Sequence, residues 1–422
     1  MGSTMDNTDE ILRAAFSNDL LRQNSSWAVF FDLDKLEQRY QRLEQAFPAD
    51  ALHAVAVKAN PLVSVLHKLV ERGAGLEAAS MGEIEVAKAA GVDPSKIVYD
   101  SPAKRTAEIK AALEQGVHIN ADNLQEVERI AELGAPGQAT IGIRINPVVG
   151  KGEIDATSVA TETSKFGVSI VRRRRALVEA FRRHRWLNAL HVHTGSQGCQ
   201  LALLVEGVRR CVDFAHHLEK NIDGCQIDTI DIGGGLPVAY RPNAEAPTIE
   251  DYADALRREV PELFDRSRRV VTEFGRWLHA PCAFAASPVE YTKPIPGGAL
   301  ATIHFGADLM LRRAYRPEDW YHHLSIHTPD GTPRVGDETD VTIAGPLCFS
   351  GDVIADGMRL PAPEPSDYVV AHDVGAYTFS MWSRYCSRPF PPIYGFRRTG
   401  GGLDFEVLHS GETDEDLARF WG

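Results

Sequence analysis

Lys58 occupies a position in this sequence that needs a chemical explanation. It directly follows the run "ALHAVAV" at residues 51–57, whose valines and alanines are typical of a buried strand, and Pro61 ends the apolar stretch. A fully buried ammonium group without a partner is costly. The lysine is therefore paired, neutralised or covalently used, unless its side chain reaches water at the strand end.

Other polar residues with chemical potential also stand where apolar runs end. His193 closes "LNALHVH", and Glu273 and Arg276 close "RVVTEFGR". Three consecutive glycines follow "TIDI": Gly233, Gly234 and Gly235. Such a turn lets backbone N–H groups approach an anion closely, although a tight structural turn has the same composition.

Pyridoxal phosphate can be bound by the combination found here: a lysine, an anion-binding turn, a carboxylate and an imidazole. The lysine can bind the aldehyde of the cofactor covalently, and Glu273 can keep the pyridine nitrogen protonated so that the ring accepts electrons. Arg276 and the hydroxyl of Ser196 would join the glycine turn in binding the phosphate.

The elements that must position these residues alternate regularly. From about residue 27 to residue 289, short apolar runs are followed by helical segments, for example "AVAVKA" by "LVSVLHKLVERG". Repeated strand–helix units predict a parallel sheet, and about eight of them favour a closed (β/α)8 barrel of the TIM type, with its site at the C-terminal ends of the strands. We predict this α/β barrel over residues 35–288.

The pattern of the sequence changes after about residue 289. Helical periodicity fades, and short β-like runs such as "ALATIHF" and "DYVVAH" take over. We predict a mostly β second domain formed by residues 1–34 and 289–422, which takes the strand "WAVFF" from the N-terminal part of the chain.

The composition excludes several classes of protein. A chain of 422 residues with 44% hydrophobic and 24% charged residues is long enough for two globular domains. A net charge of -13 argues against nucleic acid or an anionic membrane as a partner. Six widely spaced cysteines without a C-x-x-C pair favour reduced thiols and predict no metal site. No apolar run is long enough to span a membrane, and no signal peptide is evident, so we expect a cytoplasmic protein.

A set of motifs resembles one known family. The segments are "AVKANP", "AASMGEIEVAKAAG", "GIRINP", "SKFGV", "HVHTGSQ", "IDIGGGLP", "EFGR", "GPLCFSGD" and "DVGAYTFSMWSRY". In this order, over roughly residues 27 to 395, they resemble the fold-type III pyridoxal phosphate-dependent decarboxylases, the diaminopimelate and ornithine decarboxylase group.

The resemblance implies a role for each matching residue. Lys58 would bind the cofactor covalently, His193 would stack on its ring, and Glu273 would pair with the ring nitrogen. The phosphate would be held by Ser196, Gly233, Gly234, Gly235, Arg276 and the hydroxyl of Tyr377. Cys348 would donate a proton to the α-carbon from the second subunit of a homodimer with shared active sites. Lys165 and Asp352 resemble the ion pair that joins the two subunits in this family.

The chain departs from the family pattern where substrates are distinguished. Phe349 follows Cys348, where diaminopimelate decarboxylases usually carry Glu and ornithine decarboxylases carry Asp. Arg312 is shifted relative to the usual arginine, whereas Asp308 remains where an acid can meet a distal ammonium group. Trp382 adds bulk near the expected pocket. A substrate group left unpaired at Phe349 would cost about 1–3 kcal/mol.

These residues predict decarboxylation of an α-amino acid, or of an amino-acid conjugate, in a pocket more apolar than usual. A true diaminopimelate decarboxylase and an amino-acid racemase of the same fold are alternatives. A catalytically inactive regulatory homologue is a third, although such proteins typically lose cofactor residues that are present here.

Overall fold

The computed structural model describes residues 7–21, 27–134, 137 and 139–422. The chain forms two compact units. One is a barrel unit, Gln38–Val238 with Glu245–Trp277, and the other is a β-rich unit, the described part of Met1–Glu37 with Ala239–Ala244 and Leu278–Gly422. Parts of the segment 1–34 predicted for the second domain, residues 1–6 and 22–26, lie outside the described residues.

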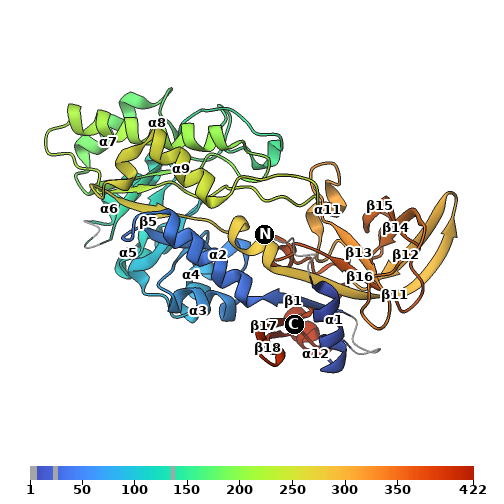
Figure 1. Ribbon diagram of the computed structural model, residues 1–422. Coiled ribbons are helices and arrows are strands. Elements are labelled where there is room, and N and C mark those ends of the chain that lie inside the picture. Colours follow the sequence, from blue (N-terminus) through green and yellow to red (C-terminus); the bar gives the residue numbers. More distant parts are fainter. Residues whose placement is uncertain (1–6, 22–26, 135–136, 138) are drawn as a thin grey trace. The chain divides into compact units, whose positions relative to one another are not determined.

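The barrel unit contains a closed sheet of parallel strands (Figure 1). Its order is β5-β4-β3-β2-β10-β9-β8-β6, and pairing of β5 with β6 closes the ring. These strands are β2 (Leu52–Ala56), β3 (Gly75–Ala78), β4 (Ile97–Asp100), β5 (His118–Ala121), β6 (Ile141–Asn146), β8 (Leu187–Val192), β9 (Thr229–Asp231) and β10 (Arg269–Thr272). A short strand, β7 (Val168–Ser169), pairs with β6. The predicted (β/α)8 fold class is confirmed.

Helices alternate with these strands along the chain and surround the barrel. They are α2 (Leu33–Ala46), α3 (Val63–Glu71), α4 (Met81–Ala89), α5 (Thr106–Glu114), α6 (Leu124–Glu132), α7 (Arg174–Arg183), α8 (Leu201–Asn221), α9 (Ile249–Glu259) and α10 (Arg276–His279). Several begin at a side-chain cap: the Ser80 hydroxyl accepts the N–H of Glu83, and the Asn123 side chain accepts that of Glu126. These caps start α4 and α6 directly after the ends of β3 and β5.

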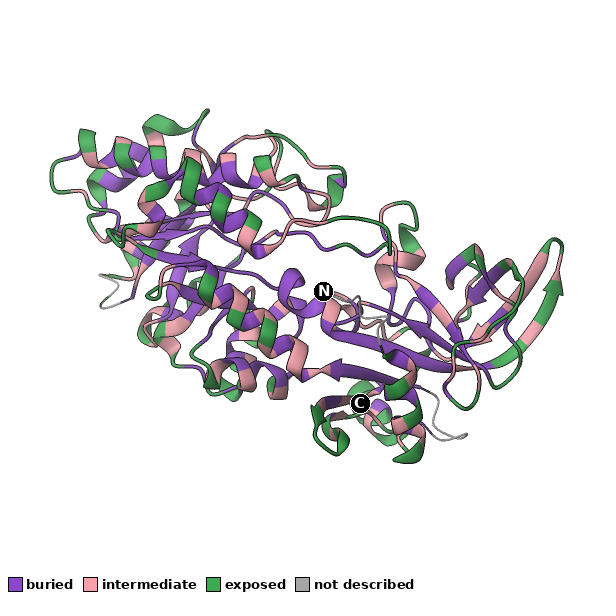
Figure 2. Ribbon diagram, in the orientation of Figure 1, coloured by how far each residue is buried: buried purple, intermediate pink, exposed green. Residues whose placement is uncertain are grey.

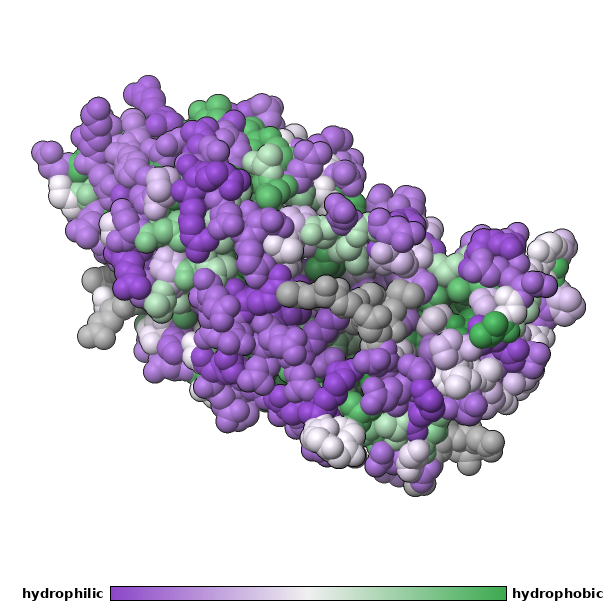
Figure 3. All heavy atoms as spheres, in the orientation of Figure 1, coloured by the Kyte–Doolittle hydropathy of each residue, from purple (hydrophilic) through white to green (hydrophobic). Residues whose placement is uncertain are grey.

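Burial follows this arrangement. The barrel strands are buried on both faces, whereas the helices bury one side and expose the other (Figure 2). The face of the barrel unit seen in Figure 3 is largely hydrophilic. Among the helices that the structure describes, none is long and apolar enough to cross a membrane.

The β-rich unit is built on a mixed sheet. It comprises β1 (Ala28–Asp32), β11 (Ala283–Ile295), β12 (Gly298–Ile303), β13 (Leu324–His327), β14 (Glu338–Ala344), β15 (Val353–Pro361), β16 (Tyr368–Ala371), β17 (Pro392–Thr399) and β18 (Gly402–Ser410), with α1 (Thr8–Ser17), α11 (Leu311–Tyr315) and α12 (Asp414–Trp421). The N-terminal strand β1 lies between β11, its antiparallel partner, and β17, its parallel partner. This is the placement predicted for "WAVFF".

The boundaries of the units differ slightly from the predicted ones. Residues 278–288 belong to the β-rich unit because β11 is one continuous strand whose first half already pairs with β1 and β16. The segment Ala239–Ala244 also belongs there, since Tyr240 packs on the ring of His322 with 4.9 Å between centroids. The Arg241 guanidinium lies 4.2 Å from the ring centroid of Tyr321.

A buried imidazole in the barrel predicts a pH dependence of stability. His53 on β2 lies 3.0 Å from the Thr272 hydroxyl on β10, and burial lowers its pKa from 6.5 to about 4. The stability that this neutral group contributes is complete above pH 6.5, where the unfolded chain also leaves it uncharged, and is lost progressively as the pH falls from 6.5 to 4.

We therefore expect the wild type to lose about 3 kcal/mol more unfolding free energy between pH 6.5 and 4 than His53→Phe, at about 1.4 kcal/mol per pH unit. Urea unfolding at the two pH values measures this difference. The lost contact with Thr272 is common to both pH values and cancels. Equal losses in the two proteins would show that His53 does not titrate as described.

Candidate active site

Lys58 lies at the mouth of the barrel, not within a strand. Strand β2 ends at Ala56, and Lys58 follows in a 3-10 turn, Val57–Ala59. Its Nζ atom lies 2.6 Å from both carboxylate oxygens of Glu77, which is fully buried on β3. The lysine side chain is 37% exposed. The ammonium group is thus paired on its inner side and accessible on its outer side.

Glu77, the partner of Lys58, has a pKa that is shifted by burial. Burial raises the pKa of Glu77 to about 7, although the attraction of Lys58 opposes this rise. A carboxyl group with a pKa near neutrality can exchange a proton with the adjacent amine at little cost. The pair therefore has the chemistry of a nucleophile beside a proton acceptor.

Three loops at the C-terminal ends of β8, β9 and β10 pack against one another around the triple glycine. A Cβ atom on Gly235, where φ is +98°, would lie 2.0 Å from the carbonyl oxygen of Gly195. A Cβ atom on Gly234 would lie 2.4 Å from the carbonyl oxygen of Glu273. A Cβ atom on Gly233, where φ is +65°, would lie 2.6 Å from the carbonyl oxygen of Val192. Only glycine fits this turn, because both the backbone conformation and the space exclude side chains.

Arg276 brings a positive charge to this turn. Its Nε and Nη2 atoms lie 3.4 and 3.5 Å from the hydroxyl oxygen of Ser196, on the loop after β8. The structure thus brings Arg276, Ser196 and the glycine turn together, although they are far apart in sequence. A guanidinium, a hydroxyl and a side-chain-free turn are the groups that phosphate-binding sites use.

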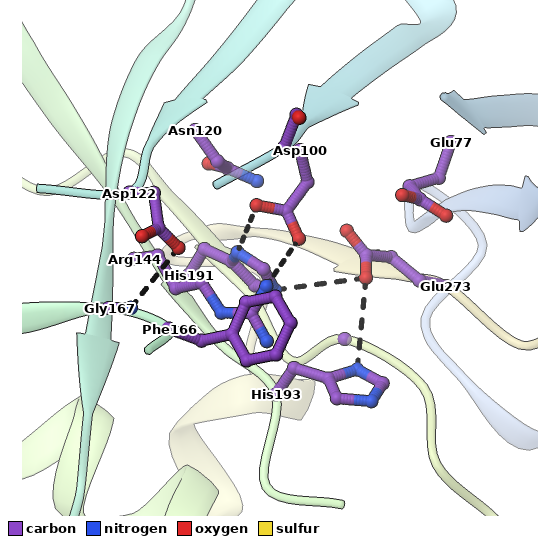
Figure 4. Close-up of polar contacts among 12 residues, drawn as sticks. Glu77, Asp100, Asn120, Asp122, Arg144, Phe166, Gly167, His191, His193 and Glu273 are labelled. Carbon is purple, nitrogen blue, oxygen red and sulfur yellow. Dashed lines mark hydrogen bonds and ion pairs between the residues drawn. The ribbon is translucent and has the colours of Figure 1, made fainter. Parts of the chain in front are cut away.

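Glu273 and His193 meet beside this cradle (Figure 4). The Nδ1 atom of His193 lies 4.0 Å from Glu273 Oε2 and accepts the N–H of Gly234 at 3.2 Å, so the imidazole carries its proton on Nε2. Burial, followed by the charges of Arg144 and Lys58, lowers the pKa of His193 to about 3. The ring is therefore neutral and held in one orientation.

A buried chain of ionisable groups lies beside Glu273 (Figure 4). Arg144 on β6 donates to Asp100 on β4 at 2.8 Å, the other oxygen of Asp100 lies 3.6 Å from His191 Nδ1, and His191 Nε2 lies 3.7 Å from Glu273 Oε2. Burial alone would raise the pKa of Asp100, but Arg144 and the other nearby cations lower it below its usual range. Burial lowers the pKa of His191 well below its usual value.

Asp100, His191 and Glu273 have ligand atoms within 4.8 Å of one another. Asp100 pairs with Arg144, and Glu273 Oε2 lies 3.7 Å from His191 and 4.0 Å from His193, so these groups form one buried network of ionisable side chains.

Glu273 is held in an environment that favours its protonated form. Burial and then the carboxylates of Asp231, Glu77 and Asp100 raise its pKa well above the usual value, although Lys58 opposes this. Its Oε1 atom is buried and accepts no hydrogen bond from a donor in the described part of the chain. Asp231, whose pKa burial raises to about 7, interacts with Glu273 and accepts the N–H of Gly233 at 2.9 Å.

These residues fit pyridoxal phosphate. The carboxyl oxygen Oε1 would be satisfied by a cationic ring nitrogen, which would also favour the ionised form of Glu273. Arg276, beside the glycine turn, would supply the countercharge of the phosphate, and the partly exposed amine of Lys58 would bind the aldehyde.

Sequence reasoning missed part of this network: Glu77, Asp100, Arg144, His191 and Asp231. A signal for them was present, because each is a charged or imidazole residue in a run that is otherwise apolar: "GLEA", "IVYD", "GIRIN", "LHVH" and "TID". Buried charges of this kind are retained only where they are paired or functional.

The remaining candidate residues lie in the β-rich unit, except Lys165, which lies in the barrel unit with its Nζ atom 4.9 Å from the ring centroid of Phe166. Arg312 lies over the rings of Tyr377 and Trp320, 4.8 and 4.6 Å from their centroids, so the structure brings Arg312 and Tyr377 together. The backbone of Tyr377 has a φ of 57°, a left-handed conformation in the turn of "DVGAY". Trp382 stacks on Trp27 at 5.9 Å between centroids.

Asp308 and Asp352 are buried in the same unit. Asp308 accepts the N–H groups of Gly306 and Leu309 at 2.7 and 2.9 Å. Asp352 accepts those of Ala307 and Leu347, both at 2.6 Å. These carboxylates shape the loops beside Cys348, and a substrate contact of Asp308 and an ion pair between Asp352 and Lys165 of a second copy stay predictions.

Comparison with known proteins agrees with this chemistry. The pyridoxal-binding domain of pyridoxal-dependent decarboxylases matches residues 33–280. The diaminopimelate decarboxylase of Methanothermobacter thermautotrophicus is 31% identical over 398 residues, 91% of this chain and 89% of the relative. The diaminopimelate decarboxylase of Streptomyces coelicolor is 33% identical over 360 residues, which cover 80% of this chain and 78% of the relative.

Solved structures extend the similarity to both units. The diaminopimelate decarboxylase of Helicobacter pylori in complex with L-lysine is similar with a TM-score of 0.84 at 27% identity, over 96% of this chain and 99% of that one. The barrel, the match over residues 33–280 and these relatives lead to one conclusion: the chain belongs to the fold-type III pyridoxal phosphate-dependent decarboxylases and is a carboxy-lyase that uses this cofactor.

Proposed function

We propose that this enzyme decarboxylates an α-amino acid, free or conjugated, whose distal end differs from that of diaminopimelate. The observation that carries the proposal is the surrounding of Phe349, which follows the proposed proton donor Cys348. Its ring stacks on Tyr315 at 5.7 Å and meets Tyr385 edge-on at 6.0 Å. An aromatic cluster stands where the family resemblance places a carboxylate.

The physical consequence concerns the distal group of the substrate. A charged end desolvated against three aromatic rings would lack a carboxylate partner, at a cost of about 1–3 kcal/mol, or roughly tenfold or more in kcat/KM. An apolar, aromatic or acylated end would bury its surface against the rings instead.

The residues of the barrel unit would divide the work. Lys58 would bind the cofactor and release it to the substrate amine, with Glu77 taking and returning the proton that this exchange requires. Glu273 would hold the ring nitrogen protonated, and His193 would cover the ring. When bound, pyridoxal phosphate accepts the electron pair left by the departing carbon dioxide. Gly233–Gly235, Ser196 and Arg276 would anchor its phosphate, together with Tyr377 from the β-rich unit of the second subunit.

The proposal includes a homodimer with shared sites, in which Cys348 and Tyr377 of one subunit complete the site of Lys58 in the other. Mixing two inactive variants, Lys58→Ala and Cys348→Ala, under conditions that exchange subunits tests this. Activity that returns on mixing supports shared sites, because one site of each heterodimer is intact. No recovery, with heterodimers demonstrated by mass, would contradict it.

Substrate choice is tested with Phe349→Glu and its control Phe349→Leu. We expect Glu at this position to raise kcat/KM for meso-diaminopimelate by roughly tenfold or more relative to the wild type, because it supplies the missing partner. Leu removes the aromatic ring without adding a charge, so it should not produce this gain.

The assay is carbon dioxide release across a panel of meso-diaminopimelate, ornithine, lysine, arginine, neutral amino acids and acyl- or citryl-conjugated diamino acids. Efficient wild-type release from meso-diaminopimelate, lowered by Phe349→Glu, would show a true diaminopimelate decarboxylase. Exchange of the α-hydrogen without release would indicate a racemase. If no member of the panel undergoes either reaction, the inactive homologue is favoured.

A further inference from the structure

Cys348 and Cys386 form a pair of thiols in the β-rich unit. The backbone N–H of Cys348 points to Cys386 Sγ at 3.5 Å, and the two side chains also hydrogen-bond, which raises the pKa of the Cys348 thiol. All six cysteines lie in the described part of the chain, and these two are the exposed ones. The sequence does not suggest this pair, because 37 residues separate its members.

The two loops that carry the thiols are held together by further contacts. The Tyr385 hydroxyl donates to the carbonyl oxygen of Cys348 at 3.3 Å, and the ring of Tyr385 meets that of Phe349 edge-on at 6.0 Å. Both contacts come from residues adjacent to the cysteines. The approach of the thiols is therefore a property of the packed loops and not of two freely moving side chains.

The backbone at Cys386 is also unusual. Cys386 and Ser387 have φ values of 60° and 49°, in the left-handed region that residues other than glycine rarely adopt. Such a conformation costs of order 1–3 kcal/mol per residue and persists where the surrounding structure enforces it. Here it turns the short helix Tyr385–Ser387 so that Sγ of its middle residue faces Cys348.

We propose that Cys348 and Cys386 are a redox-sensitive site, which a low-molecular-weight disulfide oxidises to an intramolecular disulfide. One thiolate attacks the small disulfide, forming a mixed disulfide and releasing one small thiol; the second thiolate then displaces the other small thiol and closes the Cys348–Cys386 bond. Two protein thiols are oxidised, one small disulfide is reduced to two thiols, and the protons pass to these products. A reducing thiol reverses both steps.

The consequence for activity rests on the proposed function, in which Cys348 is the proton donor. In the disulfide, Cys348 has no proton to donate and its sulfur is drawn toward the loop of Cys386. Oxidation should therefore switch the decarboxylase off reversibly, while formation of the bond itself depends only on the two loops.

The test compares the wild-type holoenzyme with Cys386→Asn, chosen because asparagine tolerates the left-handed backbone at this position. Each protein is incubated with glutathione disulfide, free thiols are then alkylated, and peptides are identified by mass. In the wild type we expect a cross-linked peptide pair lighter by two hydrogens, with at least tenfold loss of activity that dithiothreitol restores.

Cys386→Asn should keep its basal activity within about twofold of the wild type and should form no cross-link. In this variant Cys348 can carry only a glutathione adduct, whose mass differs from that of the cross-linked peptide pair. Cys225→Ser, which alters a half-buried cysteine elsewhere, should still form the cross-link.

Two outcomes would count against the proposal. Absence of the cross-linked pair in oxidised wild type, with Cys348 carrying only adducts, would overturn the site. A complete cross-link with unchanged activity would establish the disulfide but overturn the switch, and with it the assignment of Cys348 as proton donor.

Discussion

Lys58→Ala will lose decarboxylase activity by on the order of 10³-fold or more, because in the proposed function Lys58 is both the amine that binds the cofactor covalently and a proton carrier beside the substrate. The neighbouring Glu77 can then no longer pair with an ammonium group. Since burial already raises the pKa of Glu77 to about 7, it will take up a proton and not remain as an isolated charge.

Two measurements separate chemistry from folding. Borohydride should fix the cofactor to the wild type, seen as an irreversible mass increase, but not to Lys58→Ala. The double variant Lys58→Ala/Glu77→Gln, which removes both charges, should unfold cooperatively in urea. Lys88→Ala removes an exposed lysine 3.0 Å from Glu85 and should leave activity unchanged. More than about a tenth of the wild-type rate in Lys58→Ala would exclude the assigned role.

Arg144→Met will lose about 3–5 kcal/mol of unfolding free energy, because it leaves Asp100 charged and buried without its partner. The two side chains are 7% and 4% exposed and join β6 to β4 through a 2.8 Å bond. Methionine retains the aliphatic part of the arginine side chain, so the loss reports the charge more than the packing.

Urea unfolding at pH 7 measures the change. Adding Asp100→Leu to Arg144→Met should recover most of the loss, since no unpaired charge then remains. The control is Arg105→Ala, whose side chain is 83% exposed and pairs with Glu108; its removal should cost less than about 1 kcal/mol. A loss of less than 1 kcal/mol in Arg144→Met would show that Asp100 has other compensation.

Local patterns in the sequence were sufficient for the architecture. The alternation of apolar runs with helical segments depends on neighbouring residues, and it predicted the closed barrel, the β-rich second unit and the N-terminal strand that joins it. The same local logic placed Lys58, His193, the glycine turn, Glu273 and Arg276 at the ends of strands, where parallel strands converge.

Contacts between distant residues were decided by the tertiary structure alone. Glu77 became the partner of Lys58 because β2 and β3 are adjacent in the barrel, and Arg144 met Asp100 through the interior although 43 residues separate them.

Contacts between distant residues of the β-rich unit were also not predictable from the sequence. Cys386 lies beside Cys348, and Phe349 packs with Tyr315 and Tyr385, through loops whose course no periodicity predicts. The sequence by itself determined which residue types stand at the ends of which elements, since burial and backbone preferences act locally. Only the folded chain decided which of them pair, because pairing depends on the order of strands and the paths of loops.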